Sequence, residues 1–117
     1  RLPAGDRYIE VNTAGGPVRL RFREILYAEH YQHQIHIYRT DGQKTVTRQT
    51  FRELCQSLAD GRFFPCSRGV IVNLEHAEDF DGTDFVLKNG KRVPVSRDLA
   101  KNARMAFGDF LFGRRDA

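Results

Sequence analysis

The stretch FFPCSRGVIVNL, residues 63–74, places one arginine, Arg68, directly before an apolar Val-Ile-Val run. A second stretch, NGKRVPVSR at residues 89–97, places Arg97 directly after a Val-Pro-Val run. Short β-branched runs bounded by polar residues predict buried strands, so each arginine is expected in a loop at the edge of a strand. A guanidinium presents a rigid fork of donors that suits a phosphate or a guanine edge. The two arginines are therefore a candidate nucleic-acid contact surface.

The composition predicts one globular domain. The chain has 117 residues, of which 40% are hydrophobic and 29% charged, enough for one core and too few for two domains. Apolar runs such as Ile25–Ala28 are far too short to span a membrane. Cys55 and Cys66 show no disulfide framework and no metal-type spacing. These features predict a cytoplasmic setting. They do not exclude that the full-length protein is attached to a membrane.

The charges are unevenly distributed. The net charge is +4 and the pI is near 9.4, which permits a polyanionic partner. Residues 88–104 hold six Lys or Arg and one Asp, a charge of +5, whereas residues 75–84 hold five acidic residues and no Lys or Arg. We expect one basic face and one acidic edge, with the acidic run as a solvated loop or a domain-contact edge.

Strand patterns dominate the chain. Residues 18–23 alternate apolar side chains with arginines, which predicts a half-buried strand. The alternation at residues 35–38 and the segment Lys44–Thr47 predict a hairpin across Asp41–Gly42. Asn89–Gly90, flanked by apolar runs, predicts a second hairpin.

Two helices are predicted. Thr50 and Glu53 form a capping-box pattern ahead of an apolar face, and Gly61 is expected to stop that helix. The second helix is expected to begin at Ser96 as its N-cap. Its apolar face comprises Leu99, Ala103, Ala106, Phe107, Phe110 and Leu111. We assign residues 1–6 to a linker remnant, 7–112 to the domain and 113–117 to a C-terminal tail.

The order and spacing of these segments resemble the LytTR DNA-binding domain of bacterial response regulators and related transcription factors, from about Tyr8 to Ala106. The most specific parts are Phe64 with Arg68 and the VIVN run, and the VPVSR run ending at Arg97. The resemblance implies a mainly β fold: an elongated antiparallel β-sheet fold of LytTR type with two short helices. It also implies that loops, rather than a recognition helix, enter successive major grooves of duplex DNA.

Carried over residue by residue, the resemblance places DNA contacts at the loop around His33 and Gln34, at Ser67 and Arg68, and at Arg97. Three positions depart from the family pattern, which usually has histidine at Ser67, serine at Gly69 and a basic residue at Pro65. Arg68 is then left as the main base reader of its loop. Lys101 lies one helical turn after Arg97 and is expected to neutralise a phosphate.

The resulting hypothesis is a sequence-specific, double-stranded DNA-binding output domain of a transcription regulator. The family resemblance further implies paired direct repeats in promoters, two copies on the DNA, and an attached N-terminal sensor or receiver domain. The alternative is a β-rich module for single-stranded nucleic acid or a protein partner, because thirteen aromatic residues could supply stacking surfaces.

Catalysis and metal binding find little support in the sequence. Ser67 and Ser96 lack a nucleophile-elbow pattern, and no glycine-rich phosphate loop or paired carboxylates are evident. His30, His33 and His36 do not form a ligand set, because on a strand His33 would point away from the other two. We therefore expect no cofactor, no metal and no enzymatic activity.

Overall fold

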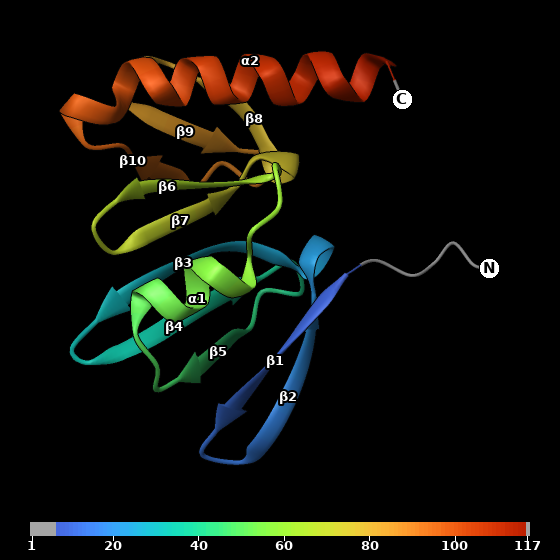
Figure 1. Cartoon of the computed structure of the whole chain (residues 1–117), viewed down its shortest axis with the longest axis vertical. Coiled ribbons are helices and arrows are strands. Elements are labelled where there is room, and N and C mark those ends of the chain that lie inside the picture. Colours follow the sequence, from blue (N-terminus) through green and yellow to red (C-terminus); the bar gives the residue numbers. More distant parts are fainter. Residues whose placement is uncertain (1–6, 117) are drawn as a thin grey trace. The chain divides into compact units, whose positions relative to one another are not determined.

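The computed structural model describes residues 7–116, with side chains through Gly113 (Figure 1). The predicted linker remnant, residues 1–6, lies outside the described residues. The chain divides into two compact units, residues 1–59 and residues 60–117, which we call unit 1 and unit 2.

Unit 1 is built from antiparallel strands and one helix. Its elements are β1 (Tyr8–Thr13), β2 (Gly16–Arg21), a 3-10 turn η1 (Phe22–Glu24), β3 (Ile25–Tyr31), β4 (Gln34–Arg39), β5 (Lys44–Thr47) and α1 (Phe51–Ser57). β1 and β2 form a hairpin, and β4 lies between β3 and β5. The predicted strand at residues 18–23 is thus β2, which starts earlier and ends where Phe22 opens the 3-10 turn.

The hairpin predicted across Asp41–Gly42 is confirmed. β4 and β5 pair in register from Tyr38 with Lys44 to Ile35 with Thr47. Gly42 has φ +85°, a conformation that side chains rarely adopt and that glycine takes without penalty. The alternation that predicted β4 also decides its packing, because Ile35 is fully buried while its neighbours Gln34 and His36 are not.

The capping box of α1 is confirmed in both directions. The Glu53 N–H donates to the Thr50 hydroxyl at 3.0 Å, and the Thr50 N–H donates to the Glu53 carboxylate at 2.9 Å. Leu54 and Leu58 carry the apolar face into the core of unit 1. The helix ends at Ser57, one turn before the glycine that we expected to stop it.

Unit 2 repeats the antiparallel plan. Its elements are β6 (Phe63–Ser67), β7 (Val70–Asn73), η2 (Leu74–His76), β8 (Ala77–Phe80), β9 (Asp84–Leu87), β10 (Arg92–Pro94), η3 (Arg97–Leu99) and α2 (Ala100–Asp116). β6 pairs with β7, and β9 lies between β8 and β10. The hairpin at Asn89–Gly90 is confirmed, and Pro94 lies on a strand at the edge of its sheet, where a missing N–H costs least.

The acidic run contains a strand, which corrects our expectation of a solvated loop. β8 buries Ala77 and Phe80 and exposes Glu78 and Asp79. A shift of register between residues 77 and 79 breaks the strict alternation that would have revealed the strand. Pairing with β9 therefore decides the conformation of a segment whose own side chains favour a loop.

Phe85 is the centre of the core of unit 2. It is fully buried, and its ring centroid lies 4.9 Å from that of Phe80, 5.8 Å from that of Phe107 and 6.0 Å from that of Phe64. Phe107 comes from α2, which runs along the sheet of β8, β9 and β10 (Figure 1). This aromatic contact, together with fully buried Ala103, joins α2 to the sheet and fixes the segment that precedes the helix.

Three expectations about the second helix require correction. Ser96 occupies the N-cap position of η3, but its side chain makes no capping hydrogen bond. The α-helix proper begins at Ala100 and runs to Asp116, so residues 113–116 continue it where we expected a tail. Leu111 is also exposed, at 43%, rather than buried as part of the apolar face.

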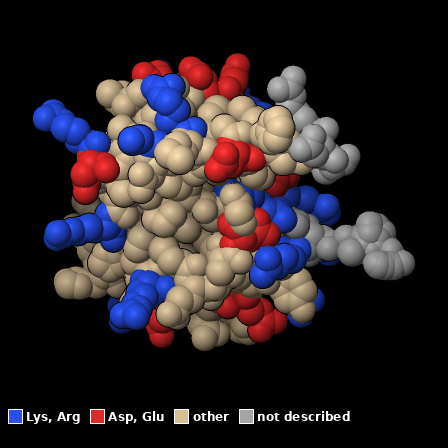
Figure 2. All heavy atoms as spheres, turned by 45° about the horizontal axis from the view of Figure 1, so that its top comes forward, with Lys and Arg blue, Asp and Glu red and all other residues tan. Residues whose placement is uncertain are grey.

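The predicted separation of charge holds only in part. Arg92, from the basic segment, donates to the carboxylate of Asp84 at 3.0 Å and also pairs with Asp81. The acidic and basic segments therefore partly neutralise each other within unit 2. Figure 2 likewise shows acidic and basic side chains interspersed over the face that it presents.

Candidate nucleic-acid interface

Arg68 lies at the tip of a tight turn. Ser67 pairs with Val70, so Arg68 and Gly69 alone connect β6 to β7. The Arg68 side chain is exposed, while Ser67 is half-buried and its hydroxyl accepts a long hydrogen bond of 3.5 Å from the Gly69 N–H. A short turn on a paired hairpin holds the guanidinium close to a rigid support.

A β-bulge at Cys66 connects this hairpin to the second predicted arginine. Pro65 pairs with Ile71 and Ser67 pairs with Val70, so Cys66 is the extra residue of β6. Its carbonyl accepts a hydrogen bond of 2.9 Å from the Ser96 N–H. Ser96, the residue before Arg97, is therefore hydrogen-bonded to Cys66, which lies two residues before Arg68. Both arginines thus lie at the same end of β6.

Arg97 and Lys101 extend the basic surface. Arg97 is the first residue of η3, and Lys101 follows four residues later in the first turn of α2. Both side chains are exposed. Within the described part of the chain, neither they nor Arg68 makes a side-chain hydrogen bond or ion pair, so all three cations can meet an external anion.

Arg104 is placed differently from these cations. Its guanidinium carbon lies 5.3 Å from the centroid of the Phe80 ring, in a cation–π arrangement. A Cβ atom on Gly82 would come within 3.5 Å of the guanidinium, and Gly82 itself has φ +103°. Arg104 therefore packs against the β8–β9 turn of unit 2.

The β3–β4 turn in unit 1 has a strained backbone. Gln32 and His33 alone connect the two strands, with φ values of +52° and +66°. Positive φ at both positions is what a type I′ hairpin turn requires, and Asn-Gly usually occupies it. We predicted a polar loop here, and the structure gives a two-residue turn with no glycine. His33 is exposed at its tip, where backbone strain often accompanies function.

Gln34 lies beside a cleft of about 470 Å³ in unit 1. Asn12, Thr13 and Ala14 from the β1–β2 hairpin form one wall. Gln34 and the end of β5 with Arg48 form the other. Sequence reasoning missed Asn12 and Arg48. Counting outward from a two-residue turn at Asp41–Gly42 would have paired position 34 with position 49, whereas Ile35 pairs with Thr47, so the register of that hairpin could not be read from the turn alone.

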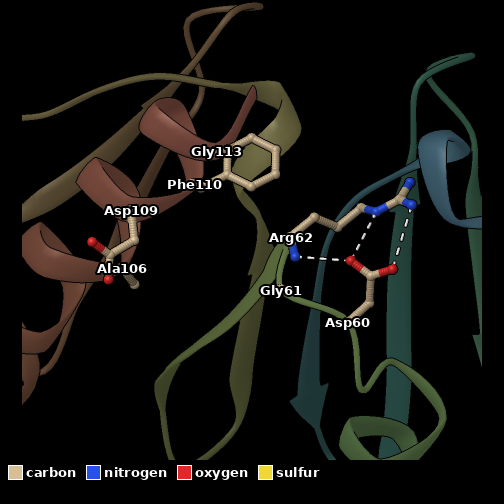
Figure 3. A pocket seen from close by; sticks show the side chains of 7 residues that line it. All are labelled: Asp60, Gly61, Arg62, Ala106, Asp109, Phe110 and Gly113. Atoms are coloured by element: carbon tan, nitrogen blue, oxygen red, sulfur yellow. Dashed lines mark hydrogen bonds and ion pairs between the residues drawn. The ribbon is translucent and has the colours of Figure 1, made fainter. Parts of the chain in front are cut away.

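A second cleft, of about 540 Å³, lies within unit 2 and includes none of the predicted site residues. Asp60, Gly61 and Arg62 line one side, and residues of α2, among them Asp109 and Phe110, line the other. Figure 3 shows Arg62 turned towards Asp60, whose carboxylate accepts from its Nε at 3.1 Å. Arg62 also pairs with Glu75, so its charge is balanced within the unit.

Two side chains of unit 2, Cys66 in β6 and Asp81 in the β8–β9 turn, have shifted pKa values. Burial raises the pKa of the Cys66 thiol to about 12, although a backbone hydrogen bond opposes the shift. The backbone N–H groups of Asp84 and Thr83, with a smaller contribution from Arg92, lower the pKa of Asp81 to about 2. Cys66 is therefore a neutral thiol at neutral pH, and Asp81 is a carboxylate that fixes the β8–β9 turn.

The histidines do not gather. His33 lies at the turn, whereas His36 packs edge-on against Tyr31 with centroids 6.0 Å apart. Across the described residues, no three His, Cys, Asp or Glu side chains come together as a metal site would need.

Neither α1 nor α2 combines the length and the apolar composition that a membrane-spanning helix requires, and the same holds for every other helix among the described residues.

The family model of the LytTr DNA-binding domain matches residues 15–108. The chain belongs to this family. A solved LytTr DNA-binding domain from Bacillus cereus, of a protein described as a methyl-accepting/DNA response regulator, is 25% identical with a TM-score of 0.73. The alignment covers 89% of this chain and 99% of that domain. No curated protein sequence matches the chain.

The comparisons confirm the predicted family and the mainly β, antiparallel LytTr fold. The chain is thus a DNA-binding domain of the kind found in response regulators. Of the predicted contacts, Ser67, Arg68, Arg97 and Lys101 belong to unit 2, whereas His33 and Gln34 belong to unit 1. The roles of these individual residues stay predictions.

Proposed function

We propose that this LytTr domain binds duplex DNA sequence-specifically and is the output domain of a cytoplasmic transcription regulator. Base edges in the major groove are read by Arg68, by Arg97, and by His33 and Gln34 at the β3–β4 turn. Lys101 neutralises a backbone phosphate, which adds affinity without sequence information. Ser67 supports the Arg68 turn and lies where it can reach the same DNA.

One observation carries this proposal: the hydrogen bond of 2.9 Å from the Ser96 N–H to the Cys66 carbonyl. It joins the start of η3 to the Arg68 hairpin, so the two exposed arginines are held near the same end of β6. Base readout needs donors held in a defined geometry, because a bidentate contact to guanine has a narrow range of productive orientations. Arginines on unsupported loops would supply charge but less discrimination.

A single-stranded nucleic-acid module is the second candidate, and Tyr31 is the observation that favours it. This side chain is 56% exposed and stands directly before the Gln32–His33 turn. An exposed aromatic ring beside polar donors can stack on an unpaired base. Most other aromatic side chains pack in the two cores, and Phe85 and Phe22 are nearly inaccessible.

A competition experiment separates the two candidates. A labelled duplex is selected from randomised DNA and is then challenged with the same duplex, its separate strands and an RNA of equal length. We expect only the duplex to compete efficiently. Equal competition by a single strand would reject the proposal and favour the Tyr31-based alternative.

The selected sequences also test the partner predictions. We expect two short direct repeats, each occupied by one copy of the domain, and a binding stoichiometry of two per duplex. In the full-length protein, an attached sensor or receiver domain would set how often the two copies meet on the DNA. A single half-site with a stoichiometry of one would contradict the paired arrangement and leave duplex binding intact.

A further inference from the structure

The cleft beside Gln34 contains three side chains whose polar groups lack a role in the fold. The hydroxyl of Thr13 donates to the Gly16 carbonyl, and the hydroxyl of Thr47 donates to the Asn12 carbonyl, both at 2.7 Å. The side chains of Asn12, Gln34 and Arg48 make no hydrogen bond or ion pair to any other described residue. The cleft therefore presents one guanidinium and two amides to whatever enters it.

The strand register explains why Gln34 and Arg48 share one wall. Ile35 pairs with Thr47, and both are buried. Gln34 precedes Ile35 and Arg48 follows Thr47, so the two lie opposite each other one step beyond the last pair. Residues opposite each other on antiparallel strands lie about 5 Å apart and on the same face of the sheet. Arg48 is therefore a direct neighbour of Gln34 in space.

From this arrangement we infer that the cleft binds a backbone phosphate of the DNA, with Arg48 as its main ligand, next to the base that Gln34 approaches. The inference rests on the proposed function, because it requires the β3–β4 turn and Gln34 to face a groove. The major groove is about 12 Å wide, so phosphates line it about 6 Å from its centre. Arg48 lies about 5 Å, the spacing of neighbouring strands, from Gln34. If Gln34 contacts a base, Arg48 therefore lies close to the phosphates that line the groove.

The chemistry of the cleft suits a phosphodiester. Arginine stays charged, and its planar fork bonds phosphate oxygens in a bidentate manner. The amide groups of Asn12 and Gln34 can donate to the same anion. No carboxylate lines the cleft among the described residues, so a bound phosphate meets no opposing charge there.

The test compares Arg48→Gln with Arg52→Gln. Arg52 is another exposed arginine of unit 1, on α1, and its side chain also lacks a partner among described residues. We expect Arg48→Gln to lower affinity several-fold on every duplex and to reduce the slope of log Kd against log salt by about 1. The preferred sequence is unchanged, whereas Arg52→Gln behaves as wild type.

A second pair of variants tests the cleft without changing Arg48. Asn12→Asp adds a carboxylate to the cleft, and Gln56→Glu adds one to an exposed position of α1. We expect Asn12→Asp to weaken binding more than Gln56→Glu. Equal effects would mean that only overall charge matters, which would overturn the inference. Circular dichroism and thermal unfolding show that each variant is folded.

Further measurements distinguish a DNA phosphate from free phosphate as the ligand of the cleft. They also distinguish failure of this inference from failure of the proposed function. In NMR titrations, duplex DNA is expected to shift the signals of Asn12 and Arg48, whereas inorganic phosphate at the same concentration leaves them unchanged. Shifts with inorganic phosphate alone would assign the cleft to a small anion and reject the inference. Unchanged DNA binding by Arg48→Gln, with specificity still lost in Arg97→Ala, would reject the inference and leave the proposed function standing. Loss of duplex preference in the wild-type competition would reject the proposed function itself.

Discussion

The Ser96 N–H donates to the Cys66 carbonyl, at 2.9 Å, at the one place where β6 has an extra residue. A bulged residue is out of step with the ladder, so its carbonyl can accept from a different segment. The bulge thereby couples the Arg68 hairpin to the start of η3. The same residue that breaks the regular pairing of β6 thus positions Arg97.

Replacing the Ser96 donor tests this coupling. Ser96 has φ −56°, which proline adopts readily, so Ser96→Pro removes the N–H with little change of backbone angle. We expect a loss of about 0.5–1.5 kcal/mol in the free energy of unfolding and weaker binding to specific DNA. Chemical denaturation and fluorescence anisotropy measure the two effects.

Ser96→Ala is the matched control. It keeps the N–H, and the serine side chain makes no capping hydrogen bond that alanine would lose. We expect stability and DNA affinity close to wild type. If alanine and proline weaken DNA binding equally, the side chain rather than the hydrogen bond to Cys66 supports the site.

The role of Arg97 can be read from sequence preference. Arg97→Ala is expected to relax the preference at one base position by about 1–3 kcal/mol, because a bidentate contact to guanine is lost. Arg97→Lys keeps the charge but loses the fork, so it should recover general affinity and not the preference. Binding to a panel of single-base variants of the selected site measures both.

Lys101→Ala provides the contrast for this prediction. Since a phosphate contact carries no sequence information, the variant should weaken binding to every duplex alike and lower the salt slope by about 1. If Arg97→Ala shows that same uniform behaviour, Arg97 contacts phosphate and not a base.

Local turn and cap chemistry explains which parts of the fold were predictable. Asp41–Gly42 and Asn89–Gly90 predicted two hairpins correctly because a glycine at positive φ largely determines the turn around it. Thr50 and Glu53 predicted the start of α1 for the same kind of reason, since a capping box involves only residues three apart.

The parts that escaped prediction depend on residues far apart in the chain. β8 forms because Phe80 pairs with Phe85, and its own acidic side chains give no sign of this. The bulge at Cys66 and its bond to Ser96 join positions thirty residues apart, which no local pattern reports. The strand pattern alone nominated Arg68 and Arg97, and the family resemblance supplied the other candidate contacts. Arg48 was missed because that resemblance did not include it.

The Gln32–His33 turn should carry a trade-off between stability and binding. Both residues have positive φ, which costs a non-glycine residue roughly 1–2 kcal/mol. We expect His33→Gly to stabilise unit 1 by about 0.5–1 kcal/mol after the entropy cost of glycine, and to weaken DNA binding. Thermal unfolding and anisotropy titrations measure the two changes.

Gln32→Asn separates these effects. Asparagine tolerates the left-handed conformation better than glutamine, so this variant also relieves strain while it keeps His33. It should be more stable than wild type and bind DNA equally well. If His33→Gly binds DNA as tightly as Gln32→Asn, His33 makes no contact with DNA. Gln34 is then the only predicted DNA contact left beside this turn.

Asp81 predicts a pH dependence of stability. Its pKa is lowered from 3.8 to about 2 in the folded protein, so its stabilising contribution is fully present above pH 3.8. The contribution is lost as the pH falls towards 2, because the carboxylate becomes protonated in both states. Asp81→Asn should therefore be less stable than wild type at neutral pH and nearly equal to it near pH 2.

The control for this prediction is Asp79→Asn, which removes an exposed carboxylate of β8 that makes no side-chain hydrogen bond to a described residue. Urea unfolding from pH 2 to pH 7 supplies the comparison. A difference between wild type and Asp81→Asn that persisted unchanged at pH 2 would mean that the amide distorts the turn, and that charge is not the cause.

Cys66 should react only when unit 2 opens. Its side chain is fully buried, and burial raises its pKa to about 12, so almost no thiolate forms at pH 8. Cys55 is only half-buried and its pKa is raised by burial as well, so we expect iodoacetamide to modify Cys55 first. In a Cys55→Ser variant, mass spectrometry should find Cys66 unmodified until denaturant is added. Rapid labelling of native Cys66 would instead show that the bulge opens under native conditions, and that the carbonyl which holds Ser96 is not fixed.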